Sequence, residues 1–264
     1  MADLSKINEY IQQLNEISLF IKSIQEEELG LLPKSDTDKV NEITTLRQLI
    51  ASSDWPEAID SSLVTNEDSE DENTDKADTI LQEFINYPIA NTNFLDFGCG
   101  LGYVAWKAAD YGTKMSYGYD INSHEIWNRF QDKSIVLTNN LSQLPVNNFD
   151  VILMYDVLDH VENPVETLIK IKKLKTISGK VHLRCHPWTA RHGAHLFRNL
   201  NKAYIQLVFT EEELTSSLGI PPSKMQFVNK IIDPINQYKE WFEMAGLTIL
   251  KEKVSLHPIE SFFT

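Results

Sequence analysis

The sequence predicts an α/β fold whose sheet carries a ligand site at the ends of its strands. The apolar segment 94–97 leads directly into a glycine-rich turn at 98–102, and the helix-compatible segment 104–111 follows. A second apolar segment, 115–120, ends in a carboxylate, and a third, 151–154, runs into polar residues. Strands that alternate with helices and end in polar residues are typical of an open parallel sheet with a ligand at its carboxyl edge.

The glycine-rich turn indicates a nucleotide-like ligand. Gly98, Gly100 and Gly102 alternate along it, and residues without a Cβ let the chain turn sharply and let a ligand approach the backbone. The helix that follows offers unpaired N–H groups. A dinucleotide-binding turn has its third glycine where Tyr103 stands here, so the spacing argues against a nicotinamide oxidoreductase. The alternative is a tight turn without a ligand.

Composition limits the classes of function. The 264 residues carry a formal net charge of −14 and are 42% hydrophobic, which suits one α/β domain with an extension. The acidic charge argues against broad binding to phosphate backbones, and the sequence shows no cluster of Lys and Arg interleaved with aromatic residues. Nucleic acid is therefore expected to be an unlikely partner.

The two cysteines, Cys99 and Cys185, cannot form a disulfide framework, which indicates a reducing compartment. No N-terminal signal segment and no apolar run of membrane-spanning length is recognised. The chain is therefore expected to be soluble and cytoplasmic, without a membrane partner.

Three regions are expected along the chain. Residues 1–64 have apolar residues at helical spacing and are expected to form a helical extension, either a lid over the acceptor or a packing arm that could mediate a homodimer. Residues 65–78 are dense in Asp and Glu and are expected to be an acidic linker or loop. Residues 79–264 are expected to form the main domain. The oligomeric state is left open.

Local signals place the other elements of the main domain in order. A helix over 77–87 has apolar residues at helical spacing and is followed by a proline. The short apolar run 135–137 is expected to be the third strand. An Asn-Pro pair begins a helix over 163–173, and the strand 179–185 follows. Later, a Thr-x-x-Glu capping box starts one helix, and a second helix ends at a glycine after residue 245.

Two motifs resemble those of class I S-adenosylmethionine-dependent methyltransferases. The run 96–102 reads Asp-x-Gly-x-Gly-x-Gly. Phe-Asp-Val at 149–151 is followed by Asp-Val-Leu-Asp-His-Val at 156–161. The resemblance implies a Rossmann-like, mostly parallel seven-stranded sheet with a terminal antiparallel hairpin at 247–254 and 260–264. It also implies S-adenosyl-L-methionine as the cofactor.

A cofactor site is expected along the strand ends. Asp120 ends a strand where a carboxylate can accept from both ribose hydroxyls, although it could instead cap a helix. Asn140 stands where the family has an acid that accepts the adenine amino group; its amide would give a weaker contact, or it belongs to a polar loop. By resemblance, Tyr155 and Asp156 would lie near the methionine end. The expected cofactor-binding residues are Asp96, Gly98, Cys99, Gly100, Gly102, Tyr103, Asp120, Ile121, Asn140, Leu141, Tyr155 and Asp156.

The acceptor side is expected at the ends of the next two strands. By resemblance His160 would point to the reaction centre, although it could instead be a core histidine bonded to a backbone carbonyl. His160 or His186 would serve as the catalytic base. The expected acceptor-binding residues are Trp188, Arg191, His192 and His195. The histidines of this segment could also bind a metal, but Cys185 points away from His186, so no metal is expected.

The sequence thus predicts a methyltransferase that moves a methyl group by in-line displacement to an oxygen or nitrogen atom of a small acceptor. Arg191 favours an anionic acceptor. The Asp/Asn-Pro-Pro-aromatic sequence of nucleic-acid base methyltransferases is not found after the strand 151–154. Two alternatives stay open: a cofactor-binding regulatory protein without transfer activity, and a protein or nucleic-acid acceptor.

Overall fold

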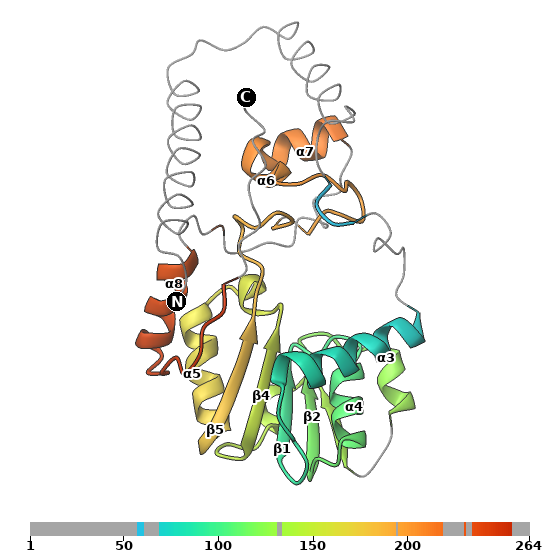
Figure 1. Cartoon of the computed structure of the whole chain (residues 1–264), viewed down its shortest axis with the longest axis vertical. Coiled ribbons are helices and arrows are strands. Elements are labelled where there is room, and N and C mark those ends of the chain that lie inside the picture. Colours follow the sequence, from blue (N-terminus) through green and yellow to red (C-terminus); the bar gives the residue numbers. More distant parts are fainter. Residues whose placement is uncertain are drawn as a thin grey trace, which may run out of the picture. The chain divides into compact units, whose positions relative to one another are not determined.

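The computed structural model describes residues 57–60, 69–130, 134–193, 195–218, 230 and 234–254 (Figure 1). These residues fall into two compact units. The sheet unit contains the described residues of 69–187 together with 230 and 234–254. The second unit contains residues 57–60 and the described residues of 188–218.

A parallel sheet of five strands forms the centre of the sheet unit in the described residues. The strands are β1 (Asn93–Phe97), β2 (Met115–Tyr119), β3 (Ile135–Thr138), β4 (Phe149–Tyr155) and β5 (Lys175–Arg184). Their order is β3-β2-β1-β4-β5, and every neighbouring pair is parallel. The strand order reverses at β1, and such a switch point is where open α/β sheets bind ligands. The predicted α/β class is confirmed.

Helices cover both faces of this sheet (Figure 1). They are α3 (Glu70–Thr79), the π-helical segment η2 (Ile80–Ile85), α4 (Tyr103–Asp110), α5 (Pro164–Leu174) and α8 (Pro234–Met244). Side chains alternate along a strand, so Leu95 and Ile152 pack with α5 and α8, whereas Phe94 and Val151 pack with η2 and α4. A sheet buried on both faces explains the near-continuous apolar runs of its strands.

The acidic run predicted to be a linker is a helix from residue 70 onward. Ser69 caps α3, because its hydroxyl accepts from the Glu72 N–H (3.2 Å) and the Glu72 carboxylate accepts from the Ser69 N–H (2.6 Å). Carboxylates in a first helical turn are stabilised by the helix dipole. Lys107 of α4 pairs with Asp78 at 3.2 Å. The linker prediction is therefore wrong for 70–78, and 65–68 lie outside the described residues.

The second unit contains α6 (Ile205–Val208) and α7 (Glu211–Leu218). The predicted capping box is confirmed: the Thr210 hydroxyl accepts from the Glu213 N–H (3.2 Å), and the Glu213 carboxylate accepts from the Thr210 N–H (2.7 Å). Asn201 donates to the Ile59 carbonyl (2.8 Å) and accepts from the Ile59 N–H (3.0 Å). Residues 188–218, expected within one domain 79–264, therefore group with 57–60.

The predicted seven strands and terminal hairpin differ from the structure. The described residues form five strands, and 247–254 form none. After α8, Gly246 has a φ of +67° and the Leu247 N–H donates to the Phe242 carbonyl (2.8 Å), which ends the helix. Leu250 is then 78% exposed, so this segment gains little from pairing with the sheet. Residues 260–264 lie outside the described residues.

The predicted helical extension 1–64 also lies outside the described residues, apart from 57–60, which are not helical. None of the helices in the described ranges combines the length and the apolar composition that crossing a membrane requires.

Candidate active site

The glycine turn between β1 and α4 folds back on the end of β2. Gly98, Gly100 and Gly102 have φ values of +86°, +48° and +86°, which residues with a Cβ rarely adopt. The N–H groups of Gly98 and Cys99 donate to the Tyr119 carbonyl at 2.7 and 3.0 Å, and the Gly102 N–H donates to the Cys99 carbonyl at 2.8 Å. Backbone hydrogen bonds therefore fix the shape of the turn.

Packing requires two of these glycines as well. A Cβ at Gly98 would collide with Val157 on the turn after β4, and a Cβ at Gly102 would lie 3.0 Å from Leu137. No atom lies within 4 Å of a Cβ placed at Gly100. The Cα face of Gly100 is therefore open, which fits a cofactor that lies against the turn.

Asp120 follows β2 and ties the glycine turn to the next segment. Its Oδ2 accepts from the Gly100 N–H (2.9 Å) and its Oδ1 from the Asn122 N–H (3.0 Å). The second bond closes a local turn, and no helix begins here, since the next helical turn starts at Glu125 with His124 at its N-cap. An ionised carboxylate accepts about four hydrogen bonds, so both oxygens keep capacity for ribose hydroxyls. This remaining acceptor capacity fits the hydroxyls of a nucleoside, and the ribose role of Asp120 stays a prediction.

Asp96 is buried beneath the turn, with 3% of its surface exposed. Burial raises its pKa to about 7, and the nearby charge of Asp120 contributes to the rise. At neutral pH the carboxyl group is therefore close to the midpoint of its titration. When ionised, it adds negative charge to a site expected to receive a sulfonium cofactor.

Trp127 is a site residue that the sequence analysis missed. It lies on the 3-10 turn η3 (Glu125–Arg129), and its indole Nε1 donates to the Gly100 carbonyl at 2.9 Å. Its ring also lies 3.3 Å from a Cβ placed at Gly102. The only signal in the sequence is an aromatic residue a few positions after Asp120.

Asn140 caps the short 3-10 turn η4 (Leu141–Gln143). Its Oδ1 accepts from the Ser142 N–H (3.0 Å) and the Ser142 hydroxyl (2.8 Å), so both acceptor positions of the amide oxygen are in use. An adenine contact would require the Ser142 hydroxyl to turn away, so this geometry favours the polar-loop alternative. Leu141 packs against the core, whereas Ile121 is 77% exposed.

Two residues of the glycine motif have side chains directed into the protein. The Tyr103 ring packs edge-on against Trp106 and Phe130, with centroids 6.4 and 5.3 Å away. Burial raises the pKa of the Cys99 thiol, and the charge of Asp96 adds to the rise. From both residues we therefore expect only backbone contacts with the cofactor.

The ends of β4 and β5 bring Asp156, Arg184 and His186 together. Arg184 Nη2 donates to His186 Nε2 at 2.8 Å, because a guanidinium group has no acceptor. Asp156 Oδ1 lies 3.5 Å from His186 Nε2 and 4.0 Å from Arg184 Nε. Asp156 has a φ of +57°, a conformation that a residue with a Cβ keeps only when its surroundings hold it. A carboxylate and a guanidinium thus both approach the same imidazole nitrogen.

Arg184 was not predicted as a site residue. It also stacks over Tyr155, with its guanidinium carbon 4.5 Å from the ring centroid. The available signal was its position near the end of the predicted strand 179–185, but its partners became evident only from the pairing of β5 with β4.

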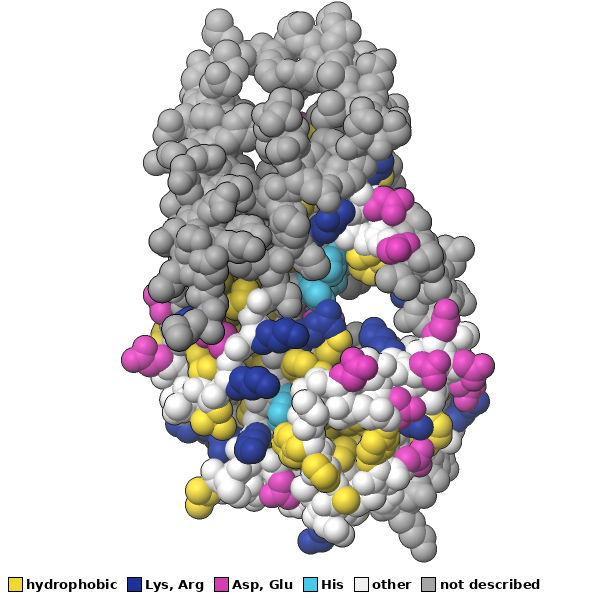
Figure 2. All heavy atoms as spheres, in the orientation of Figure 1, with side chains coloured by type: hydrophobic (Ala, Val, Ile, Leu, Met, Phe, Trp, Pro, Cys, Tyr) yellow, Lys and Arg dark blue, Asp and Glu magenta, His cyan; other side chains and the backbone are white. Residues whose placement is uncertain are grey.

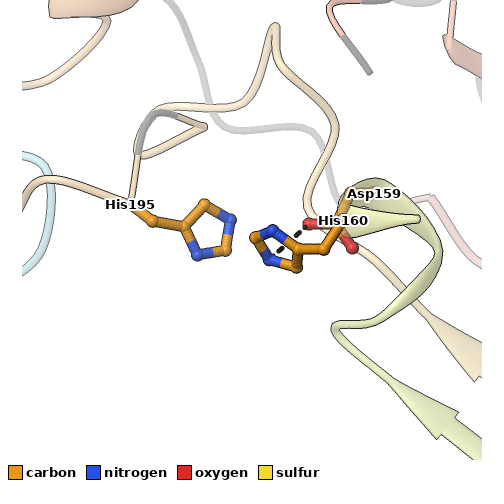
Figure 3. A group of neighbouring side chains, drawn as sticks. All are labelled: Asp159, His160 and His195. Carbon is orange, nitrogen blue, oxygen red and sulfur yellow. Dashed lines mark ion pairs between the residues drawn. The ribbon is translucent and has the colours of Figure 1, made fainter. Parts of the chain in front are cut away.

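His160 lies on the turn η5 (Leu158–His160) that follows β4. Its Nε2 is 3.4 Å from Oδ2 of Asp159, whose side chain is fully buried (Figure 3). The geometry places the imidazole beside a carboxylate, and the catalytic role of His160 stays a prediction. Figure 3 also labels His195, which belongs to the second unit.

The four predicted acceptor-binding residues, Trp188, Arg191, His192 and His195, all belong to the second unit, whereas His186 belongs to the sheet unit. Arg191 Nε donates to the Glu57 carbonyl at 2.8 Å. The His192 and His195 rings lie 6.4 Å apart. Their acceptor-binding roles stay predictions.

Turns form the segment around these residues, so His192 and His195 do not share a helical face. Gln206 fixes the segment because its Nε2 donates to the carbonyls of Trp188 and Ala190, each at 2.8 Å. The carbonyls of Trp188 and Ala190 thus bond to the Gln206 side chain.

A family model described as "Methyltransferase domain" matches residues 69–252. The chain belongs to this methyltransferase family. The predicted enzyme class and its cofactor, S-adenosylmethionine, are thereby confirmed.

Relatives of the methyltransferase include proteins named tRNA U34 carboxymethyltransferase. The one from Vibrio campbellii is 28% identical over 106 residues, which cover 36% of this chain and 32% of that relative. The one from Haemophilus influenzae is 24% identical over 191 residues, 69% of this chain and 58% of the relative. Among solved structures, phosphoethanolamine N-methyltransferase 2 from Haemonchus contortus in complex with S-adenosyl-L-methionine is 17% identical with a TM-score of 0.44, over 65% of this chain and 36% of that one.

The prediction that nucleic acid is an unlikely partner is contradicted by these relatives, whose names include tRNA. The net charge of −14 misled because a sum over the whole chain says nothing about local clustering. On β5, Lys180 and Arg184 each lie over an aromatic ring that comes from elsewhere in the sequence. Spacing along the chain did not reveal this arrangement.

Proposed function

We propose that the methyltransferase acts on an RNA acceptor, which the sheet unit binds at the carboxyl ends of β4 and β5. The observation that carries the proposal is the cluster of Asp156, Arg184 and His186, because it holds a candidate base at the carboxyl edge. Val157, next in sequence to Asp156, lies against Gly98 of the glycine turn. The cluster and the turn therefore belong to one continuous edge. The names of the relatives support RNA as the acceptor class.

When bound, S-adenosylmethionine supplies a methyl group that its sulfonium already makes electrophilic. In this proposal Asp120 accepts from the ribose hydroxyls, and the open Cα face of Gly100 lies against the cofactor. The main work of the protein is then to align the acceptor and to exclude water.

An acceptor N–H or O–H loses a proton when it is methylated, and His186 is positioned to take it. Because Arg184 donates to Nε2, that nitrogen carries no proton. Protonation of Nε2 breaks the bond from Arg184, and Asp156 Oδ1, 3.5 Å away, stabilises the imidazolium that forms. Arg184 and Asp156 thus favour opposite states of the same imidazole.

The test is transfer of a labelled methyl group from S-adenosylmethionine to an unmodified tRNA transcript by the full chain. We expect label in the RNA, which ribonuclease digestion releases. His186→Asn should lower kcat about 10²- to 10⁴-fold, as expected for loss of a general base. Its affinity for S-adenosylmethionine should not change.

Two outcomes would contradict the proposal. An enzyme that binds the cofactor but labels no RNA would rule out the acceptor. A His186→Asn variant with the full rate would rule out the base.

A further inference from the structure

One face of β5 carries cations and aromatic rings in alternation. Lys180, His182 and Arg184 occupy every second position of this strand and therefore point to the same side. Residues four apart on a strand are about 13 Å apart, so the three side chains form a line. Figure 2 shows Lys and Arg side chains together with a histidine and hydrophobic side chains over β5 and its neighbouring strand.

Aromatic residues from η2, the segment after it and β4 fill the spaces along this line. Lys180 Nζ lies 5.1 Å from the centroid of the Tyr87 ring, and the Tyr87 hydroxyl is 3.0 Å from His182 Nε2. Phe84 packs edge-on against both His182 (6.2 Å) and Tyr155 (5.5 Å). Tyr155 in turn lies beneath Arg184. We call this surface the β5 row. It consists of Phe84, Tyr87, Tyr155, Lys180, His182 and Arg184.

The charge of the β5 row comes from its two ends. Burial lowers the pKa of His182, and the charge of Lys180 lowers it further, so this ring is neutral at physiological pH. Lys180 is exposed, and the Arg184 side chain is 38% exposed. Asp156, 4.0 Å from Arg184 Nε, is the acid closest to the row among the described ion pairs. The row is thus a local cationic strip in a chain of net charge −14.

We propose that single-stranded RNA lies along the β5 row on its way to the carboxyl edge, which deepens the function proposed above and rests on it. Lys180 and Arg184 bind phosphates, and a base stacks on Tyr87 after the flexible Lys180 side chain has moved from the ring to a phosphate. Cations that follow the backbone and aromatic faces that accept bases are the two elements of single-strand recognition. The line ends at Arg184, which bonds to His186, so an RNA strand on it leads to the candidate base.

Charge and stacking can be separated with matched variants. Lys180→Glu reverses a charge on the β5 row. Lys173→Glu makes the same change at an exposed position of α5, which packs on the opposite face of the sheet. Tyr87→Phe keeps the ring, and Tyr87→Leu removes it. Cofactor affinity and thermal unfolding report whether each variant remains folded.

The measurement is the fluorescence anisotropy of a labelled single-stranded RNA of mixed sequence, titrated with the full chain at several salt concentrations. We expect Lys180→Glu to weaken binding about tenfold and to reduce the salt slope by about one unit, with Lys173→Glu close to wild type. Tyr87→Leu should lose about tenfold, the scale of one stacked base, and Tyr87→Phe should lose little.

Four results would overturn the proposal, and they separate it from the proposed function. Equal losses in Lys180→Glu and Lys173→Glu would indicate general electrostatics. If the wild type methylates RNA and both Lys180→Glu and Tyr87→Leu methylate it equally well, RNA binding by the β5 row is overturned and the RNA acceptor stands. A wild type that neither binds nor methylates RNA would overturn both. Polyglutamate that binds as tightly as RNA, with the same variant effects, would indicate an acidic protein partner.

Discussion

At the expected cofactor side of the sheet edge, where β1 meets β2, backbone conformation and backbone hydrogen bonds shape the site, with support from the Asp120 and Trp127 side chains. At the proposed acceptor side, where β4 meets β5, side-chain contacts hold the cluster together. The glycine turn is fixed by three positive φ values and by bonds to the Tyr119 carbonyl. The acceptor side depends on ionic and aromatic contacts of Arg184 with Asp156, His186 and Tyr155.

The two sides should therefore differ in how well they tolerate substitution. A backbone site tolerates few residue types, because all three glycines have a positive φ and two of them also leave little or no room for a Cβ. A side-chain site can be rebuilt by substitution without disturbing the sheet, which suits a fold that serves many acceptors. Substitutions at the turn should therefore reduce stability, and substitutions at the β4 and β5 ends should reduce activity.

The largest effect on stability is expected at Gly98. Gly98→Ala adds a Cβ that collides with Val157 and forces a residue with a side chain to a φ of +86°. We expect the free energy of unfolding to fall by about 2–5 kcal/mol, from strain and overpacking together. Urea unfolding followed by circular dichroism measures it.

Gly100→Ala is the matched control, since it adds strain but meets no atom within 4 Å. It should cost about 1–2 kcal/mol. The double variant Gly98→Ala/Val157→Ala should recover part of the loss. Equal losses at Gly98 and Gly100 would show that packing against the turn after β4 contributes nothing.

A second effect on stability, dependent on pH, is expected at Asp96. Its pKa of about 7 in the fold lies above the ordinary value of 3.8, so between these values the unfolded chain binds fewer protons than the native chain. The contribution of Asp96 to stability therefore falls by a few kcal/mol as pH rises from about 4 to about 7, and is constant above. Asp96→Asn removes this dependence, so its stability relative to wild type should rise over the same range.

Urea unfolding at several pH values measures the Asp96 effect. Asp110→Asn, on the partly exposed side of α4, makes the same charge change outside the core and serves as the control. If the difference between Asp96→Asn and wild type is independent of pH, the buried acid does not titrate as described.

Local signals predicted most of the sheet unit. The strand expected at 94–97 is β1 (Asn93–Phe97), and the helix expected at 163–173 is α5 (Pro164–Leu174). In both elements most of the apolar residues of the sequence are buried in the fold. A glycine after β1 and an Asn-Pro pair at the start of α5 mark their boundaries. Asp120 was placed correctly after β2 because a strand end is also a local feature.

The errors have two causes: one local signal was outweighed, and elsewhere long-range contacts decide. The acidic run looked unable to bury surface, yet Ser69 and Glu72 form a capping box and Ala77 is buried, so a helix forms. The capping signal was present in the sequence and was outweighed by charge density. The partners of Arg184 depend on strand register, and the grouping of 188–218 with 57–60 depends on contacts such as Asn201 with Ile59. No local pattern encodes either.

The central claim is that Asp120 and the glycine turn bind S-adenosylmethionine, and calorimetric titration of wild type and Asp120→Ala with this cofactor tests it most directly, with NAD as the control ligand. We predict binding by wild type, a loss of about 10- to 100-fold in the variant, on the scale of hydrogen bonds to a charged group, and no binding of NAD. Equal affinities in the two proteins would contradict the role of Asp120, and binding of NAD in place of S-adenosylmethionine would contradict the site as a whole.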